Sequence, residues 1–152
     1  GVFAWTPGKT QQVNFYCIDS RFYMVDPPGY GYVRGGQGLR HRLGEITEEY
    51  LRGRQTLRAV VQLVDARLGP TDADRTMIEW LREHAARSLL VFTKADKVSR
   101  ARLERLFAQL DREGALGGLE YAPFSAVTGL GRDDVLGWIG RALEAPPAPP
   151  AG

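Results

Sequence analysis

Apolar residues in this chain follow two periods, and their alternation predicts the fold. The run 57–64 is rich in β-branched residues and nearly continuously apolar, as is typical of a strand covered on both faces, and 89–92 and 119–124 predict further strands. Between and after these runs, apolar residues recur every three or four positions and predict helices. The helical positions are Met77, Ile78, Leu81 and Ala85, then Leu103, Leu106, Phe107 and Leu110, and finally Val135, Trp138, Ile139, Ala142 and Leu143. Strands that alternate with helices through short loops predict an α/β fold with a mostly parallel sheet.

Start and turn signals sharpen this pattern. The segment 71–74, Thr-Asp-Ala-Asp, resembles a capping box at the start of a helix, and Ser99 can cap the next helix. Towards the N-terminus, 12–18 and 21–25 have strand character and flank the polar pair Asp19 and Ser20. A short polar break between two such runs predicts an antiparallel hairpin, which we place at one edge of the sheet.

A further helix is predicted from residue 39 to near Gly53, because Leu43, Ile46 and Tyr50 repeat at helical spacing. Several arginines surround it. A solvated charged face is the ordinary interpretation of these arginines, and a surface that contacts phosphate groups is the alternative.

Composition narrows the class of protein. The 152 residues, 43% hydrophobic and 25% charged, suit one globular domain, which we expect to span 1–144 before a disordered Pro/Ala-rich tail at 145–152. A net charge of +2 is too small to indicate nucleic-acid binding. The single cysteine, Cys17, predicts a small core residue and a reducing compartment. No stretch approaches the ~20 apolar residues of a membrane span, so we expect a cytoplasmic protein without membrane contact.

The strand at 89–92 leads into Thr93-Lys94-Ala95-Asp96, a candidate guanine-reading loop. A carboxylate at the end of a parallel strand lies where ligands of open α/β sheets bind. It can accept two hydrogen bonds from the ring N–H and the exocyclic amine of guanine, each contributing about 1.5–3 kcal/mol, whereas adenine lacks this donor pair. The turn at 124–129 could bring a backbone N–H against the base carbonyl. An ordinary solvated loop is the alternative for both segments.

Asp26 ends the second strand of the predicted hairpin, and Gly29 follows three residues later. In this arrangement the carboxylate can hold a metal-bound water while the glycine N–H points at a terminal phosphate. The alternative is a plain Asp-Pro-Pro-Gly turn.

The segment Gly8-Lys9-Thr10 invites a phosphate-loop interpretation, which the neighbouring residues do not support. Such a loop needs a glycine where Phe3 stands, Pro7 has no N–H to offer a phosphate, and we expect no strand before the segment. It therefore predicts an exposed loop with the Thr10 hydroxyl free.

Four motifs follow one another in the order of a known family. They are Thr-Pro-Gly-Lys-Thr-Gln, Asp-x-Pro-Gly-Tyr-Gly-Tyr, Thr-Lys-Ala-Asp-Lys and Ser-Ala-x-Thr-Gly. Across residues 6–143 the chain resembles the EngB/YsxC (YihA) family of bacterial GTPases. This resemblance implies a P-loop GTPase-like three-layer sandwich that binds GTP or GDP with Mg²⁺ and hydrolyses GTP as a switch. It also implies a monomer that assists large ribosomal subunit assembly, with the subunit or its rRNA as partner, and a link to cell division.

The resemblance assigns roles to particular residues. Thr10 would coordinate magnesium, with Gly8, Lys9 and Gln11 near the nucleotide. Asp26 and Gly29 would serve the metal-bound water and the γ-phosphate, ahead of a second switch at 30–38. Asp96 would recognise guanine with Lys94 along the base, and Ser125 with Ala126 would contact its carbonyl. Thr93 and Phe124 complete the implied nucleotide contacts, and no residue is an obvious catalytic base.

Two departures from the family pattern change these expectations. Pro27 stands where leucine is usual, which removes an N–H beside the γ-phosphate site. The family's first strand, its Gly-x-x-x-x-Gly-Lys-Ser loop and its first helix are expected to be absent. A missing central strand would cost ~8–15 kcal/mol, so we expect a C-terminal part of a longer GTPase with weak or no activity. A non-catalytic GTPase-like module that binds rRNA or protein is the alternative.

Overall fold

The computed structural model describes residues 2–5, 14–18, 20–26, 41, 58–84 and 87–146. Within these residues, six strands form one sheet in the order β2-β3-β1-β4-β5-β6. The elements are β1 (Val2–Trp5), β2 (Asn14–Ile18), β3 (Phe22–Asp26), β4 (Ala59–Asp65), α2 (Asp72–His84), β5 (Ser88–Thr93), the 3-10 turn η2 (Ala95–Lys97), α3 (Arg100–Glu113), β6 (Glu120–Pro123) and α4 (Arg132–Glu144). All neighbouring strands are parallel except β2 and β3. The α/β fold expected from the sequence is confirmed.

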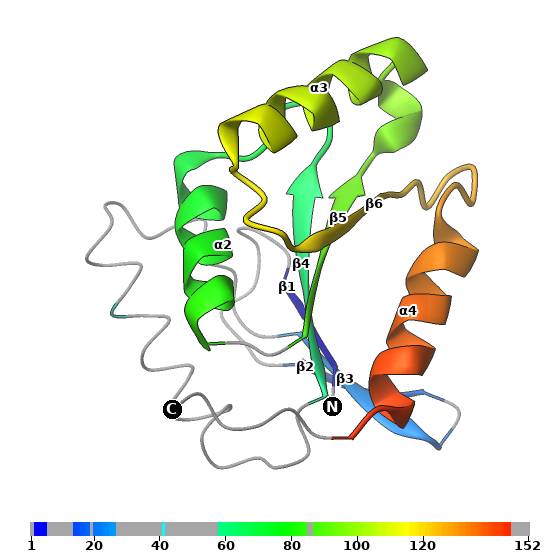
Figure 1. The fold of residues 1–152 in the computed structure, drawn as a ribbon. Helices are drawn as coiled ribbons and strands as arrows, with labels where there is room; N and C mark the ends of the chain where they lie inside the picture. The colour runs from blue at the N-terminus through cyan, green and yellow to red at the C-terminus, as the bar shows by residue number, and fades with distance from the viewer. Residues whose placement is uncertain are drawn as a thin grey trace.

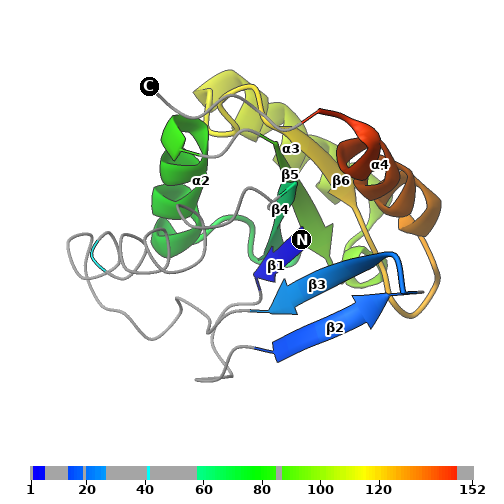
Figure 2. The same ribbon diagram turned by 90° about the horizontal axis from the view of Figure 1, so that it is seen from below.

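The strands β2 and β3 form the predicted antiparallel hairpin at one end of the sheet (Figure 2). Ser20 adopts a left-handed conformation with φ of 54°, and the N–H of Arg21 donates to the carbonyl of Ile18 at 2.9 Å. Cys17 is exposed, so its predicted place in the core is wrong. The reason is that β2 is the outermost strand, and an edge strand has no neighbour on one side to cover it.

The centre of the sheet contains a strand that the sequence interpretation missed. β1 lies between β3 and β4, where Val2 pairs with Met24 on one side and with Ala59 on the other. The expectations that no strand precedes residues 6–10 and that the first strand of the fold is absent are therefore wrong. Without β1, the facing edges of β3 and β4 would lack hydrogen-bond partners, and the apolar tetrapeptide Val-Phe-Ala-Trp supplies them. The loss of stability that was predicted for a missing central strand therefore does not apply.

Helices cover both faces of the sheet, as the side-chain alternation of the strands requires (Figure 1). Leu90 and Phe92 of β5 face α2 and α3, while Leu89 and Val91 face α4. The larger cluster consists of Val64, Ala66, Ile78, Leu90, Phe92, Ala95, Leu103, Leu110 and Leu116. The cluster under α4 consists of Ala59, Val61, Leu89, Val91, Ile139 and Ala142. This covered sheet holds the carboxyl ends of β4, β5 and β6 in fixed relative positions.

Both predicted helix starts are confirmed. The Thr71 N–H donates to Asp74 Oδ2 at 2.9 Å and the Asp74 N–H to Thr71 Oγ1 at 3.1 Å, which is a reciprocal capping box. Ser99 Oγ accepts from the Arg102 N–H at 3.2 Å at the start of α3. Among the described helices, none is both long and apolar enough to cross a membrane. Apart from residue 41, the helix predicted at 39–53 lies outside the described residues, as do residues 147–152 of the tail.

Candidate functional site

The candidate site is the edge of the sheet where β4, β5 and β6 end. Asp65, the last residue of β4, is in register with Thr93, the last residue of β5. Thr93 Oγ1 donates to the Val64 carbonyl at 3.3 Å, and the Ala66 N–H donates to the Thr93 carbonyl at 2.9 Å. The two strand ends are therefore tied together by side-chain and backbone bonds. Ligands of open parallel sheets bind at such an edge.

The predicted base-reading loop begins with a sharp change of chain direction. Lys94 has φ of 57° and ψ of 33°, a left-handed conformation that is uncommon outside glycine, and it precedes the short turn η2. The Ala95 N–H then donates to the Phe124 carbonyl at 3.0 Å, and the Phe124 N–H donates to the Phe92 carbonyl at 2.8 Å. This backbone path brings Asp96 against the turn that follows β6.

Ser125 connects the two loops through its side chain. It is fully buried at 0% exposure, and its Oγ donates to Asp96 Oδ1 at 2.9 Å. The same oxygen accepts from the N–H groups of Val127 at 3.2 Å and Thr128 at 3.1 Å. One carboxylate oxygen of Asp96 is thus fixed, while Oδ2 lies 3.8 Å from Lys97 Nζ. A carboxylate held in this way keeps its orientation before any ligand arrives.

The backbone of the same turn is also largely engaged. The Ser125 N–H donates to the Leu130 carbonyl at 3.0 Å, and the Gly129 N–H donates to the Ser125 carbonyl at 2.9 Å. Ala126 is exposed, and the structure shows no acceptor for its N–H among the residues it describes. Ala126 is therefore the residue of this turn that can offer a backbone donor to a ligand.

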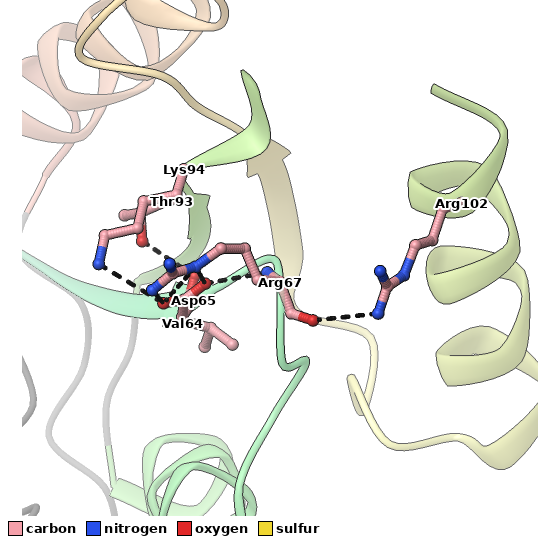
Figure 3. Close-up of polar contacts among 6 residues, drawn as sticks. All are labelled: Val64, Asp65, Arg67, Thr93, Lys94 and Arg102. Carbon is pink, nitrogen blue, oxygen red and sulfur yellow. Dashed lines mark hydrogen bonds and ion pairs between the residues drawn. The ribbon is translucent and has the colours of Figure 1, made fainter. Parts of the chain in front are cut away.

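A second group of side chains lies beside this loop and was not predicted from the sequence. Arg67 Nη2 lies 2.7 Å from Asp65 Oδ2, and Lys94 Nζ lies 3.6 Å from the same oxygen (Figure 3). The hydrogen bond from the Arg67 side chain is the main cause that lowers the pKa of Asp65 to about 2, against an opposing effect of burial. The sequence signal was present, because an aspartate ends a buried strand two positions before an arginine.

The residues predicted to serve the phosphates are placed only in part. Asp26 ends β3, which lies three strands from β5, or about 14 Å at the usual spacing between strands. The backbone of Asp26 is thus at the carboxyl end of a parallel strand, as expected. The other residues predicted to serve the phosphates lie outside the described residues, namely Gly8, Lys9, Thr10, Gln11 and Gly29. The same is true of Pro27 and of the predicted second switch at 30–38.

The fold and the linked loops at its edge define the class of the protein, which is the P-loop GTPase class of α/β proteins. A family model described as 50S ribosome-binding GTPase matches residues 2–94. Relatives then identify the family within that class: the chain belongs to the EngB family of GTP-binding proteins. It is 40% identical over 137 residues to a probable GTP-binding protein EngB of Leuconostoc mesenteroides, covering 88% of this chain and 70% of that protein. The corresponding protein of Limosilactobacillus reuteri is 42% identical over 134 residues, covering 88% and 68%.

Solved structures support the same fold. A crystal structure of a probable GTP-binding protein engB superimposes with a TM-score of 0.69 at 15% identity, covering 93% of this chain and 97% of that one. The protein Era, in complex with MgGDPNP and nucleotides of 16S ribosomal RNA, gives a TM-score of 0.64 at 18% identity, covering 98% and 58%. At these identities the likeness concerns the fold alone.

Proposed function

We propose that this chain binds GTP and GDP and acts as a GTP-hydrolysing switch, with Asp96 selecting guanine. The observation that carries the proposal is the bond from Ser125 Oγ to Asp96 Oδ1, which fixes a carboxylate at the carboxyl edge of a parallel sheet. A carboxylate with a fixed orientation can accept the two N–H donors of guanine without reorganising. The 40% identity to EngB proteins supports the assignment to guanine nucleotides.

The neighbouring residues complete the base site in this proposal. The Ala126 N–H is the donor for the base carbonyl, because the Ser125 N–H is engaged by Leu130. The side chain of Lys94 lies along the base, with Thr93 and Phe124 supporting the two loops. Asp96 thus provides selectivity, and the surrounding groups provide affinity.

For the phosphates we propose the residues that the family resemblance implies. Thr10 would hold Mg²⁺ with Gly8, Lys9 and Gln11 nearby, and Asp26 would hold a metal-bound water ahead of Gly29. A hydroxyl and a carboxylate are oxygen donors of the kind that Mg²⁺ prefers. Phosphate oxygens of the nucleotide and water would complete the coordination. When bound, the ion neutralises charge on the phosphates.

The biological setting is also a proposal. The matching family model is described as 50S ribosome-binding, which supports large ribosomal subunit assembly with the subunit or its rRNA as the partner. A link to cell division and a monomeric state remain predictions from the resemblance. A non-catalytic module that binds rRNA is the second candidate, and it is favoured by the arginines Arg40, Arg42, Arg52 and Arg54 in and beside the segment 39–53, which could contact phosphate groups.

Nucleotide binding by the full chain tests the proposal. With Mg²⁺ present, GDP and GTP should compete with a fluorescent guanine nucleotide at least a hundredfold better than ADP and ATP. This factor follows from the two hydrogen bonds to the Asp96 carboxylate, each contributing about 1.5–3 kcal/mol. Equal competition by adenine nucleotides would overturn it. GTP turnover should be slow, because Tyr30 stands where some related switches carry a water-orienting glutamine. Guanine binding without any turnover, together with salt-sensitive rRNA binding in every nucleotide state, would favour the second candidate.

A further inference from the structure

We propose that Asp65 and Arg67, at the end of β4, form a positioning pair for Lys94 and so set nucleotide affinity without setting base choice. The inference rests on the proposed function, because it assigns Lys94 to the base site. It adds two residues that none of the four sequence motifs contains. The pair acts through Lys94 and is not itself placed in contact with the nucleotide.

The first step is that Arg67 fixes the Asp65 carboxylate. Arg67 Nε donates to Asp65 Oδ1 at 3.1 Å and Nη2 donates to Oδ2 at 2.7 Å, which is the bidentate geometry of a guanidinium on a carboxylate. The backbone N–H of Arg67 also donates to Oδ1 at 2.9 Å. With three donors from one residue, the carboxylate is held in a single orientation.

The second step is that the Asp65–Arg67 pair is anchored to the fold. The Arg67 carbonyl accepts from Arg102 Nη2 of α3 at 3.4 Å (Figure 3). On the other side, the strand ends are joined by the bond from Thr93 Oγ1 to the Val64 carbonyl. These bonds therefore fix the position of the Asp65 carboxylate relative to the backbone of Lys94, the residue that follows Thr93.

The third step concerns the freedom of the Lys94 side chain. It is 56% exposed, so without a partner its four-carbon stem would sample many rotamers in solvent. Its ammonium lies 3.6 Å from Asp65 Oδ2, and its backbone is held in the left-handed conformation. Figure 3 shows the Lys94 and Arg67 side chains converging on Asp65 from different strand ends. Restricting the stem before binding reduces the entropy that a nucleotide must otherwise remove.

This arrangement separates two properties of the site. Asp96 distinguishes bases by their donors, whereas an ordered Lys94 stem supports any purine ring that enters. Loss of the pair should therefore weaken GDP and IDP by the same factor, since IDP differs from GDP only by lacking the exocyclic amine. A merely structural role for Asp65 would lower stability without acting through Lys94.

A double-mutant cycle on the full chain tests the inference. The variants are Asp65→Asn, Lys94→Ala and the combination, each titrated with GDP and IDP. Asp65→Asn alone should weaken both nucleotides about two- to fivefold, the modest range expected for a partly exposed ion pair. In the Lys94→Ala background the same change should have no further effect, because the residue it acts through is gone. Glu104→Gln, which removes the exposed pair of Arg100 and Glu104 on α3, is the matched control and should leave both affinities unchanged.

Three results would overturn the inference while leaving the proposed function standing. They are an equal loss from Asp65→Asn with and without Lys94, a gain in affinity from Asp65→Asn, and a lower melting temperature with unchanged affinity. A wild-type chain that binds neither nucleotide would instead overturn the proposed function, and this inference with it.

Discussion

Two buried serines lie at opposite ends of the sheet, and they differ in what surrounds them. Ser125, beyond the carboxyl end of β6, is 0% exposed and its Oγ takes part in three hydrogen bonds. Ser88, at the amino end of β5, is 7% exposed, and its Oγ has no hydrogen-bond partner among the residues that the structure describes. Ser88 also lines a cavity of about 400 Å³ that includes Arg87 and Trp138. The cavity therefore lies at the amino end of the sheet, beside the Ser88 hydroxyl that has no described partner, and polar and apolar residues both line it.

The difference supports the carboxyl end of the sheet as the candidate site. There, the bond between Ser125 and Asp96 joins loops 29 residues apart, and the Asp65–Arg67 pair reaches Lys94 from a third strand end. At the amino end, Trp138 Nε1 donates to Glu120 Oε2 and Arg87 donates to the Ala142 carbonyl, as separate pairs. Linked groups hold one another in place, so one substitution at the carboxyl end changes several contacts. The cavity at the amino end, whatever its volume, has no such linked set of side chains among the described residues.

Asp96→Asn should give the largest effect and tests the carboxyl end directly. The substituted amide would present donors to the donors of guanine, so GTP affinity should fall by about 3–6 kcal/mol, the sum of two charged hydrogen bonds. Xanthine nucleotides, which carry a carbonyl in place of the amine, should become the preferred ligands. Competition binding with GTP and XTP measures both changes. Glu120→Gln at the amino end is the control, and an unchanged GTP preference in Asp96→Asn would remove that residue from its role.

Gly131→Ala should have the next largest effect, on stability. Gly131 has φ of 75°, and an added Cβ would lie 1.9 Å from the carbonyl oxygen of Pro123, at the carboxyl end of β6. Left-handed strain alone costs of order 1–3 kcal/mol, and the backbone clash adds to it. Urea unfolding measures the loss.

The matched control lies in α4, the helix that begins directly after Gly131. Gly140→Ala in α4 meets nothing within 4 Å, so it should stabilise the chain by about 0.5–1 kcal/mol. Equal losses in the two variants would show that the turn before α4 tolerates the added methyl group.

Ser125→Ala and Ser88→Ala compare the two ends with the same chemical change. Removing Ser125 Oγ leaves Asp96 Oδ1 and the N–H groups of Val127 and Thr128 without this partner, which should cost about 1–3 kcal/mol in unfolding free energy and weaken GTP binding. Removing Ser88 Oγ breaks no hydrogen bond within the described part of the chain, so stability should be unchanged or slightly higher. Parallel urea titrations of the two variants measure their unfolding free energies. Equal losses would contradict the contrast drawn between the ends.

The sequence predicted those parts of the fold that depend on local periodicity. The apolar run at 57–64 became β4, and Thr71 and Ser99 begin the helices they were expected to begin. β1 was missed because four residues are too few to show a period, and its place depends on the unpaired edges of β3 and β4. Tertiary pairing, not local preference, determined that strand.

The candidate site shows the same division. Asp96 and Lys94 could be named as candidates from the sequence because a short polar motif follows an apolar strand. The hydroxyl bond of Ser125 and the pairing of Asp65 with Lys94 were missed, because each joins residues 29 positions apart in sequence. The left-handed backbone of Lys94 was also not predictable, since lysine rarely adopts it and only the surrounding bonds hold it there. A sequence motif can therefore predict candidate ligand-binding residues, whereas the residues that orient them depend on tertiary contacts.

Acid titration gives the smallest expected effect and tests the Asp65–Arg67 pair as part of the carboxyl end. The Arg67 side chain lowers the pKa of Asp65 from 3.8 to about 2 in the folded state. A depressed carboxyl pKa contributes stability above the unfolded pKa near 4, and that contribution disappears as the pH falls from about 4 to about 2. Solvent screening at the exposed Arg67 reduces it to about 1 kcal/mol. The difference in unfolding free energy between wild type and Asp65→Asn should therefore narrow over this pH range, and Arg67→Gln should show the same narrowing. A constant difference from pH 5 to pH 2 would mean that the pair does not stabilise the folded chain through its charge.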